Sequence, residues 1–174
     1  MHHADIIDEY RIDDLGAPFS VILERSVGMV RGKHGLSPVI PDPTGLVYET
    51  TAARARHPRR LSGADLLFMR RAVEMSREDF GHAMGSSEAD IVAYEDGVRA
   101  IPAPLDGLVR VHAYHRLKSK MPNGLDRMIA FMDWLFDDHR YSPLHEAGHE
   151  MSFTFHYKNG HGWMLCDVDE EARA

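Results

Sequence analysis

The sequence predicts an α+β protein, with helices in the centre of the chain and strands towards both ends. Apolar residues recur at helical spacing between positions 61 and 117, whereas the tail from Met151 alternates between apolar and polar residues. Near the N-terminus, the apolar run Phe19–Leu23 lies between Pro18 and a charged turn, which is typical of a strand. These observations predict an N-terminal β-hairpin and helix module over 1–58, a helical domain over 59–120, and a C-terminal helix and β-hairpin over 121–174.

The length and composition restrict the class of protein. A chain of 174 residues can bury one good core, or one core with small appendages. No apolar run approaches the roughly twenty residues of a membrane span, and the N-terminal residues do not resemble a signal peptide. The single cysteine, Cys166, excludes an internal disulfide and a thiolate zinc cluster within one chain. We therefore expect a cytoplasmic protein that does not contact a membrane.

Strands in the N-terminal module are predicted from short apolar runs. A short strand is expected over Tyr10–Asp13, and Val27–Arg31 is expected to pair with Phe19–Leu23. Glycine and proline residues between positions 32 and 43 predict turns and a loop after these strands.

A helix is predicted over residues 45–56, capped by Thr44, with arginines in its last turn that suit the negative end of the helix dipole. The basic stretch 54–60 follows directly. One interpretation is that Arg56, Arg59 and Arg60 contact phosphates, and the other is a helix terminus followed by a solvated linker.

Residues 61–104 contain the signals of three short helices. The apolar spacing over 66–73 predicts the first of them. Ser76 precedes an aspartate by three residues, as in an acidic capping box, and so predicts a second helix that ends at Gly85. Ser86 or Ser87 then caps a third helix. Two short helices around a glycine turn are typical of a helix-turn-helix.

This segment resembles the Xre (lambda-repressor-like) helix-turn-helix family. The matching pieces, in order and without gaps, are LLFMRRA, SREDFGHAMG and SSEADIVAYEDGVRAIP. The flanking HPRRLSGADLLFMRRA and IPAPLDGLVRVH are similar to a narrower branch, the MqsA-like (YgiT-type) antitoxin regulators, although the zinc-binding cysteines of that branch are missing. The resemblance implies a central five-helix domain, completed by a helix over 104–117. It also implies a sequence-specific DNA-binding transcriptional regulator, either a repressor or an antitoxin-like autoregulator.

The resemblance also implies which residues contact double-stranded DNA. The third helix, 87–95, would lie in the major groove with Glu88 and Ala89 at the base-reading positions. Arg77 corresponds to the first-turn position of the second helix, and Arg99 corresponds to the basic contact beyond the third. The complete set of predicted DNA-contacting residues is Arg59, Arg60, Ser76, Arg77, Ser87, Glu88, Ala89, Ala93 and Arg99.

The charge distribution leaves an alternative open. The net charge is −7, but the stretch from Arg59 to Lys120 holds ten Lys or Arg against nine Asp or Glu. Acidic flanks around a nearly neutral centre suit a DNA-binding module with acidic neighbours. However, Glu88 and Asp90 place negative charge on the expected recognition helix. A protein-interaction adaptor derived from a helix-turn-helix that no longer binds DNA would have the same pattern.

The C-terminal third predicts an amphipathic helix and a hairpin. Apolar residues recur over 125–137 on a stripe wider than one buried face requires, which indicates either a homodimer interface or packing against the hairpin. The hairpin is expected to turn at Lys158–Gly160 and to return over 162–168. A partner protein such as a toxin is a further expected partner.

One catalytic motif is present as a string of letters. His145, Glu146 and His149 form HExxH, which on a helix would place both imidazoles on one face for zinc. The available helix is about two turns long, and Phe155 occupies the position of a third zincin histidine. Ordinary surface histidines are the alternative to a zinc hydrolase. We expect no enzyme activity, no cofactor and no metal.

Overall fold

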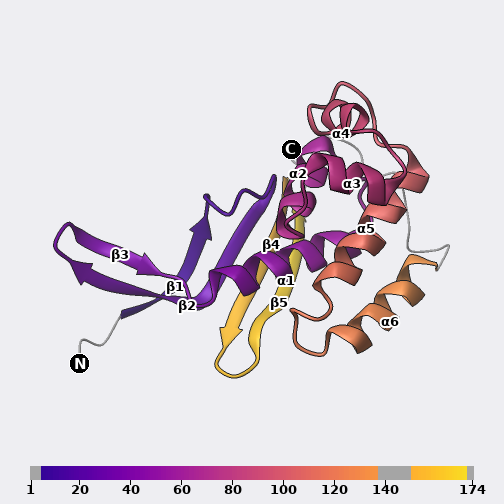
Figure 1. The fold of residues 1–174 in the computed structure, drawn as a ribbon. Helices are drawn as coiled ribbons and strands as arrows, with labels where there is room; N and C mark the ends of the chain where they lie inside the picture. The colour runs from indigo at the N-terminus through magenta and orange to yellow at the C-terminus, as the bar shows by residue number, and fades with distance from the viewer. Residues whose placement is uncertain (1–4, 137–149, 172–174) are drawn as a thin grey trace.

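The structure is a computed structural model that describes residues 5–136 and 150–171, and its described part is α+β (Figure 1). Five strands form one mixed sheet: β1 (Asp5–Ile12), β2 (Ser20–Gly32), β3 (Gly35–Val39), β4 (Glu150–Lys158) and β5 (Gly162–Glu171). The helices are α1 (Pro43–Arg56), α2 (Gly63–Ala72), α3 (Arg77–Met84), α4 (Glu88–Glu95), α5 (Ala103–Leu117) and α6 (Gly124–Leu135).

The sheet joins the two ends of the chain. Its order is β1-β2-β4-β5, with β3 paired to the far part of β2. Strands β2 and β4 run parallel, with Ser20 opposite Ser152 and Leu23 opposite Phe155. The N-terminal and C-terminal segments, which the sequence suggested as separate modules, therefore share one sheet.

The expected pairing of Phe19–Leu23 with Val27–Arg31 is wrong. Both segments fall almost entirely within the single strand β2, which pairs with β1 on one side and with β3 and β4 on the other. The residues between them form a bulge, in which Arg25 takes a φ of 46° and β2 gains one residue relative to β1. The first strand is also longer than expected and covers Asp5–Ile12.

Helix α1 begins two residues earlier than predicted, and its cap is Asp42 rather than Thr44. The Asp42 carboxylate accepts a hydrogen bond from the Gly45 amide at 2.9 Å. Pro43 occupies the first helical position, where its fixed φ suits a helix and its missing N–H costs nothing. The proline therefore sets the start of the helix one residue before the threonine.

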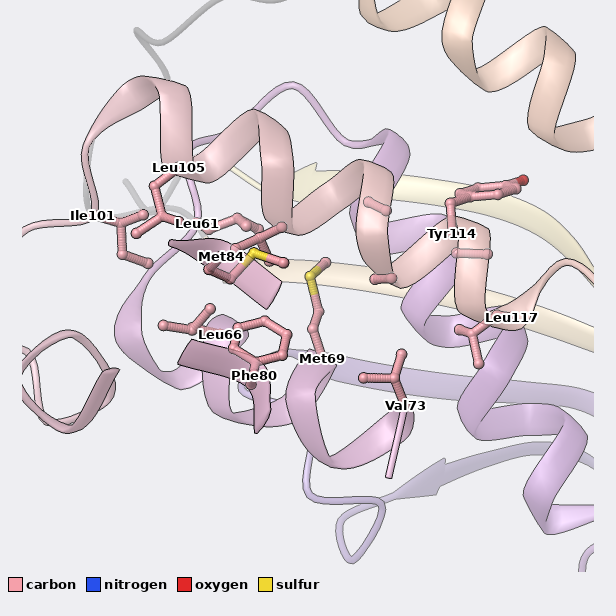
Figure 2. Packing of buried hydrophobic residues seen from close by; sticks show 14 of the residues in the cluster. Leu61, Leu66, Met69, Val73, Phe80, Met84, Ile101, Leu105, Tyr114 and Leu117 are labelled. Carbon is pink, nitrogen blue, oxygen red and sulfur yellow. The ribbon is translucent and has the colours of Figure 1, made fainter. Parts of the chain in front are cut away.

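Helix α1 lies between two hydrophobic cores. Its Leu46 and Ala53 pack towards the sheet, whereas Ala52 and Ala55 pack towards the other helices. Because alanines lie on both faces of α1, the sheet and the other helices can each approach this helix closely. Figure 2 shows part of the helical core, which includes Leu61, Leu66, Met69, Val73, Phe80, Met84, Ile101, Leu105, Tyr114 and Leu117.

Helix α6 packs on the helical core and not on the hairpin that was one expected neighbour. The rings of Tyr114 on α5 and Phe131 on α6 stack with centroids 4.5 Å apart and planes 7° apart. The opposite side of α6 leaves Leu125, Ile129 and Phe136 exposed.

The C-terminal hairpin is confirmed. Met151, Phe153 and Phe155 are buried on one face of β4, and the strand ends at Lys158 before the turn. The alternation of apolar and polar residues therefore identified the face of β4 that packs into the core at the sheet.

Candidate nucleic-acid interface

The centre of the candidate interface is the pair α3 and α4, joined by a three-residue turn. Gly85 ends α3 in the left-handed region with a φ of 65°, which a glycine adopts at no steric cost. Gly81 lies against the turn, because a Cβ built there would be 2.8 Å from the carbonyl oxygen of Ser86. Phe80 and Ile91 are fully buried and hold the two helices on the core. These features confirm the predicted helices and turn.

Both predicted phosphate-contacting serines cap helices. The Ser76 hydroxyl accepts from the Asp79 amide at 3.0 Å, and the Ser87 hydroxyl accepts from the Asp90 amide at 3.1 Å. Each hydroxyl also donates to the carboxylate of the same aspartate at 2.7 Å. Their oxygens are therefore bound within the helix terminus, and the N-cap is Ser87, not Ser86.

Arg77 is part of an ion-pair network beneath the interface. Its Nε donates to Glu95 at 2.8 Å, and Arg70 donates to both oxygens of the same carboxylate at 2.6 and 3.2 Å. Burial alone would raise the pKa of Glu95, but the hydrogen bonds from Arg70 and Arg77 lower it overall. The network ties α2 and α3 to the end of α4.

Arg99 is paired with the recognition helix itself. Its Nη1 donates to Asp90 at 2.5 Å, and its guanidinium lies 5.7 Å from the Tyr94 ring centroid. The hydrogen bonds from Ser87, together with Arg99, lower the pKa of Asp90. The side chain of Arg99 remains 57% exposed, so the pair is at the surface, where ion pairs contribute little.

The outward side of α4 carries small and acidic side chains. Glu88 and Ala89 are exposed, and Ala93 is half-buried one turn later. Beyond the helix, Val98 is 82% exposed. The exposed or half-exposed carboxylates on α3, on α4 and just after it are Glu78, Asp79, Glu88, Asp90 and Asp96. The surface near Arg77 and Arg99 is therefore not a continuous basic patch.

Arg59 and Arg60 lie before α2 and beside the sheet, not on α3 or α4. Both line a cleft of about 400 Å³, together with Arg11 of β1 and Ser20 of β2. Their carbonyl oxygens accept hydrogen bonds from buried guanidinium groups. The predicted set therefore divides into a group on and beside α3 and α4 and a group at the sheet.

A buried clamp fixes the basic stretch before α2, and the sequence interpretation missed it. Arg54 forms two hydrogen bonds with Asp65, at 2.8 and 2.9 Å, and donates to the carbonyl oxygens of Arg59 and Arg60. A second buried arginine, Arg110, donates from its Nε to the carboxylate of Asp106 at 2.5 Å.

Arg110 also donates to the carbonyl oxygens of Ala55, His57 and Arg59. The expected helix terminus is confirmed, since α1 ends at Arg56, but the residues after it are not a solvated linker, because their carbonyl groups bond to two buried side chains. The i,i+4 pair Asp106–Arg110, beside the buried Leu105 and Val109, was the available sequence signal.

The HExxH string at His145, Glu146 and His149 lies outside the described residues. Within residues 5–136 and 150–171, no cluster of three or more His, Cys, Asp or Glu could hold a metal ion. In the same part of the chain, every helix is too short or too polar to cross a lipid bilayer.

Comparison with known proteins returned no match to a family model, a curated protein or a solved structure.

Proposed function

We propose that the protein is a sequence-specific regulator of transcription that binds double-stranded DNA as a dimer, acting as a repressor or an antitoxin-like autoregulator. The observation that supports it best is the pair α3 and α4, two capped eight-residue helices joined at Gly85. The N-terminus of α4 is exposed and carries the small residue Ala89, which lets a helix approach a groove closely.

Direct readout would use the first turns of α4. Glu88 can accept a hydrogen bond from cytosine N4, and the methyl groups of Ala89 and Ala93 can contact a thymine methyl. The amides of the first turn of α4 and the guanidinium of Arg99 would meet phosphates. Arg99 would exchange Asp90 for a phosphate, which its exposure permits.

Dimerisation would use the uncovered side of α6. Leu125, Ile129 and Phe136 follow one another at spacings of four and seven residues, which places them on one side of the helix. A two-fold dimer presents two recognition helices to the two half-sites of a palindromic operator.

The test measures fluorescence anisotropy of a labelled duplex carrying the upstream region of the gene, with a random duplex as competitor. The informative variant is Ala89→Asp, which adds a charge at the N-terminus of α4. The matched control is Thr44→Asp, at an exposed position in the first turn of α1. We expect Ala89→Asp to weaken specific binding at least about tenfold, because a misplaced charge faces the bases, and Thr44→Asp to leave it unchanged.

A salt titration then identifies the phosphate contacts. Each neutralised phosphate contributes about 0.9 to the slope of log affinity against log salt concentration, so Arg99→Ala should reduce that slope by about one. Equal affinity for both duplexes at low salt, or no binding by the folded protein, would exclude sequence-specific DNA recognition.

A second candidate is a protein-interaction adaptor, favoured by the carboxylates around α4 and by the pairing of Arg77 and Arg99 with Glu95 and Asp90. Such a surface suits a basic partner segment. Calorimetric titration with an arginine-rich peptide tests it, with Glu88→Gln and Asp96→Asn as variants. Saturable peptide binding that both variants weaken, without duplex binding, would favour the adaptor.

A further inference from the structure

A groove of about 720 Å³ lies between α1 and the edge strand β5. Its volume lies within the range of about 300–1,000 Å³ that small-molecule sites occupy. One wall is α1 and the other is the hairpin of β4 and β5, and Arg127 of α6 is also among the lining residues.

A bulge in β5 makes the sheet wall apolar. Leu165 lies opposite Phe155 and Val168 lies opposite Phe153, although their spacing of three would place them on opposite faces of a regular strand. The bulge absorbs the extra residue, so both positions are opposite inward-facing residues of β4. Leu165 nevertheless remains 44% exposed and Val168 37% exposed.

The helix wall leaves space and supplies a cation. Ala52 and Ala53 line the groove with side chains of one carbon each, and the buried rings of Phe153 and Trp163 form its floor. Arg56 stands at the end of the helix, exposed, and forms no ion pair with a residue of the described chain.

The other charged side chains in the groove, Arg127 and Glu49, already bind each other. Arg127 donates to both oxygens of Glu49, at 2.7 and 2.6 Å. Glu49 therefore has little capacity to bind a cationic ligand, while Arg56 can form a charge-assisted pair with an anion.

We propose that this groove binds an amphipathic organic anion, with an apolar or aromatic body against Leu165, Val168 and Trp163 and a carboxylate or sulfonate at Arg56. Exposed apolar side chains gathered in one concave site, with Arg56 at one end and Arg127 already paired with Glu49, are what such a ligand requires.

The test uses anilinonaphthalene sulfonate as the probe, in the full chain. Trp134→Phe leaves Trp163 as the single tryptophan, because the chain has two. Energy transfer from Trp163 then reports binding of the probe, and the variants below locate that binding. The neutral phenylnaphthylamine, which lacks the sulfonate, is the matched ligand. We expect saturable binding of one probe, and about tenfold weaker binding of the neutral compound.

Two variants test where the anionic group and the apolar body of the probe bind. Arg56→Gln should weaken the sulfonate about tenfold and leave the neutral compound unchanged, so that the preference for the anion disappears. Leu165→Ala should weaken both compounds, by about threefold to tenfold. Arg31→Gln removes the same charge at the far end of β2 and should change neither. Both groove positions are exposed, and a thermal midpoint confirms that each variant is folded.

Three results would overturn the assignment. They are the absence of saturable transfer, equal weakening by Arg31→Gln and Arg56→Gln, and equal affinity for the charged and neutral probes. If Leu165→Ala instead lowers the mass measured by sedimentation while the probe does not bind, the groove is an interface between copies of the chain. The readout uses no DNA, so a failure to bind duplex leaves it unaffected.

Discussion

Arg54 and Arg110 bind carboxylates in the interior of the protein, whereas Arg77 and Arg99 bind carboxylates at the candidate interface. The side chains of Arg54 and Arg110 are 0% exposed, and each also donates to main-chain carbonyl groups. The side chains of Arg77 and Arg99 are 40% and 57% exposed, and their guanidinium groups donate to Glu95 and Asp90.

The difference shows which arginines can serve a ligand. A buried guanidinium with several acceptors cannot leave them without exposing unpaired polar groups to a low dielectric. The exposed Arg99 can exchange the partly exposed Asp90 for a phosphate at little cost, because water screens both states, whereas the Glu95 that binds Arg77 is buried. Similar ion pairs therefore support the fold in one place and leave a surface available for binding in the other.

The largest effect is expected when Arg110 is replaced. Arg110→Met leaves the buried Asp106 carboxylate without its guanidinium partner and removes donors to three carbonyl groups. The free energy of unfolding should fall by about 3–5 kcal/mol, measured by urea denaturation. Arg116→Met, on the exposed side of α5, should change it by less than about 0.5 kcal/mol. A loss below about 1 kcal/mol in Arg110→Met would mean that the clamp is not needed.

A smaller loss is expected at Glu95. Glu95→Gln weakens hydrogen bonds to two arginines and should cost about 1.5–3 kcal/mol at neutral pH. The pKa of Glu95 is lowered in the folded state, so its contribution is complete above its ordinary value of 4.5 and is lost as the pH falls through the folded value.

Urea denaturation at pH 7 and pH 4 checks this, because the variant should lose less stability on acidification than the parent. An equal loss in both proteins would show that Glu95 does not contribute to the acid dependence.

The third effect tests the turn between α3 and α4. Gly81→Ala places a Cβ 2.8 Å from the Ser86 carbonyl oxygen and must move the turn. We expect a loss of about 1–3 kcal/mol, together with weaker duplex binding. Gly107→Ala in α5 meets no atom within 4 Å and should be neutral or stabilising, by up to about 1 kcal/mol. Thermal denaturation measures both, and a loss in Gly107→Ala alone would contradict the packing described.

The smallest effect on stability is expected at Arg99. Arg99→Ala should leave the thermal midpoint within error of the parent, because its pair with Asp90 is exposed. Under the proposed function, the same change should weaken duplex binding. A clear fall in the midpoint would place Arg99 with the structural arginines instead.

Much of the local structure was predictable, because helix caps act over three residues. Ser76, Ser87 and Gly85 mark the boundaries of α3 and α4 through bonds to their own neighbours. The alternation from Met151 to Tyr157 predicted the hairpin for the same reason, since successive residues of a strand point to opposite faces of the sheet. At α1, Pro43 was a local signal that the choice of Thr44 overlooked.

What only the tertiary structure decided depends on residues far apart in the chain. The parallel pairing of Ser20–Leu23 with Ser152–Phe155 brings together segments that no local pattern relates. The sequence also did not distinguish the roles of the arginines, because the residue type does not indicate whether a guanidinium is buried or exposed. By itself the sequence determined the helices, the turn and the hairpin through short-range hydrogen bonding and periodicity. Burial separated the clamp from the candidate interface, because burial sets the dielectric and the partners around each charge.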